Sequence, residues 1–107
     1  MLTGGNSPKE LYLQLATTYK NEIDWSKVYI FWGDERWVPL NDDLSNAKMS
    51  YSTLLSHVPI PQENIFEMYK DGVTPEDYAA EYEKLFPKII DWMLMLYESF
   101  KINYKNC

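Results

Sequence analysis

The first segment suited to chemistry is Thr3-Gly4-Gly5-Asn6-Ser7-Pro8, a glycine-rich turn that leads into an expected helix. Glycines allow the backbone to approach an anion closely, and the free N–H groups at a helix start can bind phosphate without a net positive charge. An ordinary strand-to-helix turn with a good N-cap has the same residues. The motif therefore indicates a phosphate loop only when other features agree.

The second segment is Gly33-Asp34-Glu35-Arg36-Trp37-Val38-Pro39, directly after an apolar run. Arg36 can offer a bidentate fork to a phosphate, and Asp34 or Glu35 can accept hydrogen bonds from sugar hydroxyls or orient another group. A surface loop in which Arg36 pairs with its neighbours is the alternative. Polar groups at the end of a buried strand are where an open α/β sheet meets its ligand.

Two elements must position these segments. Ser7, Pro8 and Glu10 form a helix-start pattern with Ser7 as the N-cap. The helix that follows has an apolar stripe at helical spacing: Leu11, Tyr12, Leu15, Ala16 and Tyr19. Residues 28–32 are apolar at every position, which predicts an inner strand of a parallel sheet, covered on both faces.

The rest of the chain continues this alternation. A second helix is expected at Ala47, Tyr51, Leu54, Leu55 and Val58, ending at Pro59. A short strand at 64–68 and a third helix after Thr74 follow. Beyond Phe86, periodicity fits either another helix or a buried strand, and residues 101–107 are expected to fray. The pattern indicates an α/β fold.

Composition excludes several classes of protein. The net charge is -6 with scattered basic residues, so neither a nucleic acid nor an anionic membrane is an expected partner. The single cysteine, Cys107, provides no disulfide and no cysteine-based metal site, which fits a reducing cytoplasm. The longest apolar run, 92–97, is too short to span a bilayer, and no leader sequence is expected.

In combination, the motifs resemble those of the 6-phosphogluconolactonase family. The glycine-rich turn is similar to the family's Ser/Thr-Gly-Gly-x-Ser/Thr-Pro phosphate loop. Asp24-Trp25-Ser26-Lys27-Val28 and Trp32-Gly33-Asp34-Glu35-Arg36 resemble the family's Asp-Trp-x-x-Val…Trp-Gly-Asp-Glu-Arg segment. Further motifs follow in the family's order: Val38-Pro39, Ser45-Asn46, His57-Val58-Pro59-Ile60-Pro61 and Asn64-Ile65. The resemblance covers residues 2 to about 86.

The resemblance implies a Rossmann-like α/β fold that hydrolyses 6-phosphoglucono-δ-lactone to 6-phosphogluconate in the pentose phosphate pathway, without metal or organic cofactor. It implies that Gly4, Gly5, Asn6, Ser7 and Arg36 bind the phosphate of a sugar-phosphate substrate. Asp34 would have a supporting catalytic role in the substrate crevice.

The chain departs from the family pattern at both ends. Only Met1-Leu2 remains of the strand before the phosphate loop. The family's Gly-x-Gly-x-Asp-Gly-His loop, whose histidine is thought to act as the general base, does not follow 91–94. We therefore interpret residues 1–86 as a partial domain with an incomplete Rossmann-like parallel sheet and flanking helices, and residues 87–107 as a divergent C-terminal segment.

The remaining candidates are weaker. His57, the only histidine, is expected at the end of the second helix, away from the crevice and without a catalytic role. Trp25, Trp32 and Trp37 are expected to pack the core, with Trp37 the one most suited to face the crevice. Two other functions stay open: a glucosamine-6-phosphate deaminase, although that group usually has an aromatic residue in place of Arg36, and a non-catalytic phosphosugar-binding remnant.

The isolated chain should have no significant lactonase activity and only marginal stability. A positioned base contributes about 10²–10⁴-fold to rate, and nothing here replaces it. The exposed edges of an incomplete sheet should cause self-association. Lactone hydrolysis above the spontaneous background, light scattering and thermal melting test this. A monodisperse monomer with a cooperative melt, or turnover that is lost in His57→Ala, would contradict it.

Overall fold

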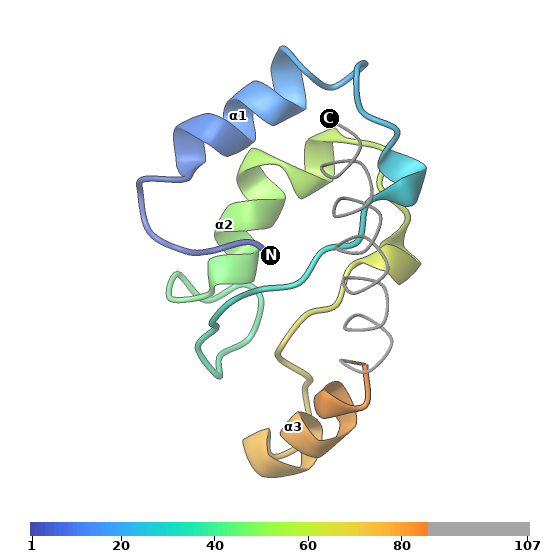
Figure 1. The fold of residues 1–107 in the computed structure, drawn as a ribbon. Helices are drawn as coiled ribbons and strands as arrows, with labels where there is room; N and C mark the ends of the chain where they lie inside the picture. Colours follow the sequence, from blue (N-terminus) through green and yellow to red (C-terminus); the bar gives the residue numbers. More distant parts are fainter. Residues whose placement is uncertain (86–107) are drawn as a thin grey trace, which may run out of the picture. The chain divides into compact units, whose positions relative to one another are not determined.

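The computed structural model describes residues 1–85 (Figure 1). The chain divides into two compact units, Met1–Pro75 and Glu76–Cys107. The described helices are α1 (Lys9–Thr17), α2 (Asn46–Thr53) and α3 (Pro75–Glu83), with short 3₁₀ helices at Trp25–Lys27, Leu55–His57 and Gln62–Asn64. Our alternatives for 87–107 lie outside the described residues.

Helix α1 begins slightly later than its sequence indicates. The N-cap residue is Pro8 in a helical conformation, and no side chain caps the helix, so the prediction of Ser7 as the N-cap is wrong. The backbone carbonyls of Asn6 and Pro8 instead accept the N–H groups of Lys9 and Tyr12, at 3.2 and 3.0 Å. A turn of main-chain hydrogen bonds thus precedes the helix.

The buried face of α1 is narrower than the apolar stripe. Tyr12 and Ala16 are buried, whereas Leu11 is 56% exposed and Tyr19 is 44% exposed. Helix α1 lies against α2 (Figure 1). Its two buried side chains, Tyr12 and Ala16, belong to the same apolar cluster as residues of α2 and of the central segment. The predicted stripe is therefore correct in register and too wide.

The central extended segment pairs with the chain start. Leu2 and Trp32 form an isolated parallel bridge. The Leu2 N–H donates to the Phe31 carbonyl at 2.6 Å, and the Gly33 N–H donates to the Leu2 carbonyl at 2.9 Å. This is the hydrogen-bond pattern of neighbouring parallel strands.

On its other edge the same segment pairs with residues 64–66. Ile30 and Ile65 form the second parallel bridge. The Ile30 N–H donates to the Asn64 carbonyl at 2.8 Å, and the Phe66 N–H donates to the Ile30 carbonyl at 2.9 Å. Within residues 1–85 no longer ladder extends these two bridges, so the parallel pairing is present only at single residues.

The central segment has one fully covered face. Ile30 and Trp32 are buried, but Tyr29 is 51% exposed, so the prediction of a segment buried on both faces is wrong. Phe31 is half-buried and its ring stacks on Phe66 with centroids 4.6 Å apart. Successive side chains of an extended segment point to opposite faces. Ile30 and Trp32 therefore share one face, and residues of α1 and α2 pack against that face.

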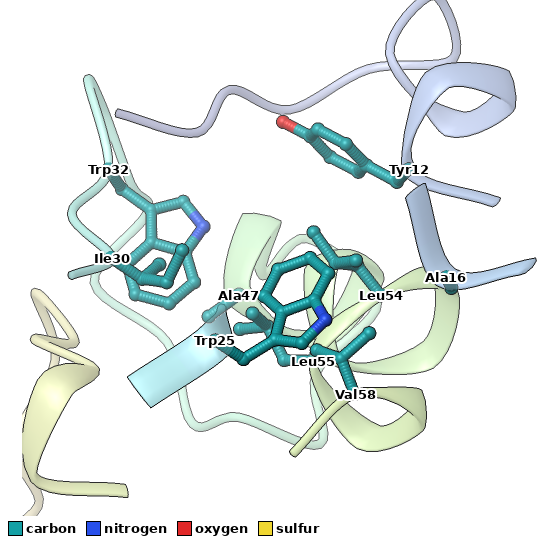
Figure 2. Close-up of a cluster of buried hydrophobic side chains, with 9 residues drawn as sticks. All are labelled: Tyr12, Ala16, Trp25, Ile30, Trp32, Ala47, Leu54, Leu55 and Val58. Atoms are coloured by element: carbon teal, nitrogen blue, oxygen red, sulfur yellow. The ribbon is translucent and has the colours of Figure 1, made fainter. Parts of the chain in front are cut away.

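One apolar cluster joins these elements (Figure 2). Trp25 and Trp32 are 5% and 2% exposed, as expected for core tryptophans. The cluster consists of Tyr12, Ala16, Trp25, Ile30, Trp32, Ala47, Leu54, Leu55 and Val58. Its members come from α1, from the segment between α1 and α2, from α2 itself and from the residues that directly follow α2. This cluster therefore determines how α2 meets the central segment.

The two buried indoles both have hydrogen-bond acceptors. Trp25 Nε1 donates to the Lys20 carbonyl at 2.8 Å, and Trp32 Nε1 donates to Ser50 Oγ at 3.1 Å. Ser50 is fully buried on α2 and its hydroxyl donates to the Asn46 carbonyl at 3.1 Å. Because an unpaired indole N–H in a core is costly, the Trp32–Ser50 pair fixes the rotation of α2.

The second compact unit contains most of α3. Tyr82 is 6% exposed, and its ring centroid lies 6.0 Å from that of Tyr78. Burial, with the neighbouring Tyr78 as a smaller cause, raises the pKa of Tyr82 to about 12. The predicted apolar stripe of this helix is therefore covered at Tyr82, while Ala79 is exposed.

Ser50→Ala should lower the free energy of unfolding by about 1–3 kcal/mol, because the Trp32 indole N–H would lose its buried acceptor. Ser52→Ala is the matched control. Ser52 also lies on α2 and donates to a backbone carbonyl, that of Met49, but it is exposed. Urea denaturation followed by circular dichroism measures both variants. Equal effects of the two substitutions would contradict the role of the indole bond.

Candidate functional site

The carboxylate of Glu35 lies at the N-terminus of α2. Its Oε1 accepts the Asn46 N–H at 2.7 Å, and its Oε2 accepts the Ala47 N–H at 2.8 Å and the Ser45 hydroxyl at 3.2 Å. Oε1 also accepts the N–H of Arg36 at 2.8 Å. A negative charge at the first amides of a helix is stabilised by both hydrogen bonds and the helix dipole.

This arrangement changes the role expected of Glu35. The sequence offered Glu35 as an alternative to Asp34 for accepting sugar hydroxyls, but its carboxylate is already satisfied by four protein donors. The N-terminus of α2 therefore holds an internal anion, and Glu35 joins the loop at 33–39 to that helix. Asp34 is exposed, and its side chain makes no hydrogen bond to any residue from 1 to 85.

Arg36 is held on one side and open on the other. Its Nη1 donates to the Leu44 carbonyl and to Asn46 Oδ1, both at 3.3 Å. Its other guanidinium N–H groups have no acceptor within residues 1–85, and the residue is exposed. The guanidinium is thus oriented by neutral acceptors and forms no ion pair with a carboxylate of residues 1–85, which leaves it available to an anion.

Asn46 connects the two segments that the sequence singled out. It is 4% exposed, and its Nδ2 donates to the Asp34 carbonyl at 3.1 Å while its Oδ1 accepts from Arg36. The same carboxamide packs on Gly4: a Cβ atom at that position would lie 2.0 Å from Oδ1. The structure therefore brings Gly4, Asp34 and Arg36 together around one buried side chain.

The glycine-rich turn is shaped by two further features. Gly5 has a φ of +86°, which side chains disfavour. The Tyr12 hydroxyl accepts the Thr3 N–H and donates to the Thr3 carbonyl, both at 3.0 Å. Gly5, Asn6 and Ser7 are exposed beyond this tether. They lie in the turn next to Gly4, so their backbone N–H groups remain candidates for binding an anion.

Sequence reasoning missed two residues of this site. In the sequence, Asn46 stands out only within the Ser45-Asn46 pair, and Tyr12 only as part of an apolar stripe. A polar residue at the first position of a helix, 10 residues after the candidate Arg36, was the available signal. Its contact with Gly4 depends on tertiary packing that no local pattern contains.

The structure also shows the surroundings of the two remaining candidates, Trp37 and His57. Trp37 is 36% exposed and packs against Tyr69, with ring centroids 5.0 Å apart. His57 is the last residue of the 3₁₀ helix that follows α2, whereas Asn46 is the first residue of α2. The His57 Nε2 lies 2.8 Å from the Ser52 carbonyl oxygen. The structure thus places His57 away from Arg36.

A cavity of about 420 Å³ lies beside His57. It is lined by Leu13, Ala16, Thr17, Lys20, Thr53, Ser56 and His57, none of which is a predicted site residue. Its threonine hydroxyls donate to helix carbonyls, Thr17 to Leu13 and Thr53 to Met49. It is therefore separate from the Gly4 and Arg36 arrangement.

The described part of the chain holds no group of three or more His, Cys, Asp or Glu side chains arranged to bind a metal. Among the helices of residues 1–85, none has the length and apolar character needed to cross a membrane.

Comparison with known sequences identifies the family. The model of the family described as glucosamine-6-phosphate isomerases/6-phosphogluconolactonase matches residues 1–99. The chain belongs to this family. The match continues past residue 86, where the recognisable motifs end.

Individual members of the family are similar over most of the chain. A 6-phosphogluconolactonase of Mycobacterium leprae is 47% identical over 89 residues, covering 79% of this chain and 36% of the relative. One from Synechocystis is 42% identical over 82 residues, covering 77% and 33%. The chain thus spans about a third of the length of the curated relatives it matches.

The structural comparison agrees on the fold class. The crystal structure of a 6-phosphogluconolactonase from Thermotoga maritima has a TM-score of 0.68 and 31% sequence identity, covering 81% of this chain and 38% of that one. This family has an α/β fold, which confirms the predicted class.

Glu35→Gln should lower the free energy of unfolding by about 1–3 kcal/mol, because an amide NH₂ would replace one of the oxygen atoms that accept N–H groups from α2. Asp34→Asn removes the same charge from the neighbouring residue and should have an effect below about 0.5 kcal/mol. Chemical denaturation of both variants decides between local hydrogen bonding and a general charge effect. The latter would give equal shifts.

Proposed function

We propose that this chain provides the phosphate-binding part of a 6-phosphogluconolactonase, and that the whole protein hydrolyses 6-phosphoglucono-δ-lactone to 6-phosphogluconate. The observation that carries the proposal is the contact of Asn46 with both Gly4 and Arg36. It brings a glycine-rich turn and an oriented guanidinium into one site, which is a recurring arrangement for a phosphate ester.

In the proposed site, backbone groups at Gly4, Gly5 and Asn6, with Ser7, bind the phosphate oxygens. Arg36 adds a charge-assisted hydrogen bond through the N–H groups that face away from Leu44 and Asn46. The exposed Asp34 carboxylate accepts a hydrogen bond from a sugar hydroxyl and supports catalysis from the crevice. These roles fix one end of the substrate.

The reaction itself is ester hydrolysis. Water attacks the lactone carbonyl, the ring C–O bond breaks, and a carboxylate and a hydroxyl group form. A general base must take the proton of the water within hydrogen-bond reach. His57 is unsuited to this because it lies at the far end of α2, so the base comes from another segment of the protein. Ester hydrolysis of this kind requires only water and such a base, so the proposal includes no metal or organic cofactor.

The proposal extends to the surroundings of the site. The two parallel bridges support a Rossmann-like sheet, with residues 1–86 as its partial domain. The net charge of -6 argues against a nucleic-acid partner, and the single cysteine supports a cytoplasmic location. Arg36 favours a lactonase over a glucosamine-6-phosphate deaminase. A non-catalytic phosphosugar-binding protein is the alternative. Binding of the ligand without hydrolysis of the lactone would favour it.

Arg36→Ala should weaken binding of 6-phosphogluconate by about 1–3 kcal/mol, the usual loss for a charge-assisted hydrogen bond to an anion. Calorimetric titration of the chain measures this. Lys27→Ala is the control, since Lys27 is an exposed cation whose nearest carboxylate is Asp24, outside the two motifs. Equal affinities of wild type and Arg36→Ala, or equal losses in both variants, would contradict the proposal.

A further inference from the structure

The backbone of Asn46 is held in place by hydrogen bonds that do not involve its side chain. Its N–H donates to Glu35 Oε1 at 2.7 Å, and its carbonyl accepts the Ser50 hydroxyl at 3.1 Å. Ser50 in turn accepts the indole N–H of the buried Trp32. The first residue of α2 is therefore connected both to the loop at 33–39 and to the apolar core, and it has little freedom to move.

The orientation of the Asn46 carboxamide follows from its partners. The Asp34 carbonyl can only accept a hydrogen bond, and the Arg36 guanidinium can only donate one. Nδ2 must therefore face Asp34 and Oδ1 must face Arg36, as the distances of 3.1 and 3.3 Å show. An aspartate would place a second oxygen against the Asp34 carbonyl and a negative charge beside Arg36.

The third contact of the carboxamide is with the glycine-rich turn. At Gly4 an added Cβ would lie 2.0, 2.4 and 2.8 Å from Oδ1, Cγ and Nδ2 of Asn46. Every residue type except glycine would displace the amide. Gly33 provides the contrast, because the nearest atom to its Cβ position is a backbone oxygen at 3.7 Å. The absence of a side chain at position 4 therefore leaves the space that the Asn46 carboxamide occupies. This role is separate from any close approach of a ligand to the Gly4 backbone.

We propose that Asn46 is a positioning residue that sets the distance and angle between the Gly4 turn and the Arg36 guanidinium, so that both reach the same phosphate group. The inference rests on the proposed function and adds a determinant of its specificity. Asn46 acts through Arg36 and Gly4 and does not itself bind the ligand. Selectivity for a phosphate ester then depends on the spacing of the Gly4 turn and the Arg36 guanidinium, which the buried Asn46 carboxamide connects.

The first experiment is a double-mutant cycle on affinity for 6-phosphogluconate. Asn46→Ala should weaken binding about tenfold in the wild-type chain, the order expected when a charged donor loses its orienting acceptor. In the Arg36→Ala background the same substitution should change affinity by less than about twofold, because substitutions of residues that act through one another are not additive. Asn41→Ala is the control and should leave binding unchanged, because Asn41 is an exposed asparagine in the segment that leads into α2.

Asn46→Asp provides a second variant of nearly equal volume. It should weaken binding more than Asn46→Ala does, because its carboxylate competes with the phosphate for Arg36. Circular dichroism verifies that each variant is folded. Equal losses from Asn46→Ala in both backgrounds, or an Asn46→Asp variant that binds as tightly as the wild type, would overturn the positioning role.

A second cycle, on unfolding, separates this inference from the proposed function. Gly4→Ala should lower the urea midpoint of the wild-type chain and have a much smaller effect when Asn46 is alanine, while Gly33→Ala should be nearly neutral. If the wild type does not bind 6-phosphogluconate, the phosphate site itself is wrong. If it binds and Arg36→Ala reduces affinity, but the Gly4 and Asn46 substitutions are additive in unfolding, only the positioning role is wrong.

Discussion

The interaction on which the described structure most depends is the contact between the Glu35 carboxylate and the first amides of α2. A helix start leaves several N–H groups without partners, and a loop that carries charged residues has no intrinsic shape. The Glu35 carboxylate accepts the N–H groups of Asn46 and Ala47 at the start of α2. It also accepts the Arg36 N–H and so holds residues 34–36 in place. The direction of Arg36 follows from this contact, and so does the position of Asn46.

The site and the core are consequently one structure. From Trp32 the hydrogen bonds run through Ser50 to Asn46 and from there to Asp34 and Arg36. Apolar burial positions the helix, and polar contacts at its N-terminus transmit that position to the exposed groups. A substitution in the core that rotates α2 would therefore also move the guanidinium, because Asn46 connects the two.

The sequence predicted those features that depend on local pattern. The family, the α/β class and the buried Trp25 and Trp32 followed from motifs and apolar spacing. It overestimated burial at Tyr29 and Leu11, because a residue type does not specify which faces of an element become covered. It missed the role of Glu35 and the contact of Asn46 with Gly4, because both join residues distant along the chain. Such contacts depend on tertiary packing and leave only weak local signals.

The Tyr12 hydroxyl has a further consequence, because it contacts both the N–H and the carbonyl of Thr3. A neighbouring strand would provide an acceptor for the Thr3 N–H and a donor for the Thr3 carbonyl. The Tyr12 hydroxyl provides both, so a single phenol from α1 takes the place of a strand partner. The start of the turn is thereby tied to the helix that follows it. A loop ordered before its ligand arrives loses less conformational entropy on binding, so more of the contact energy becomes affinity.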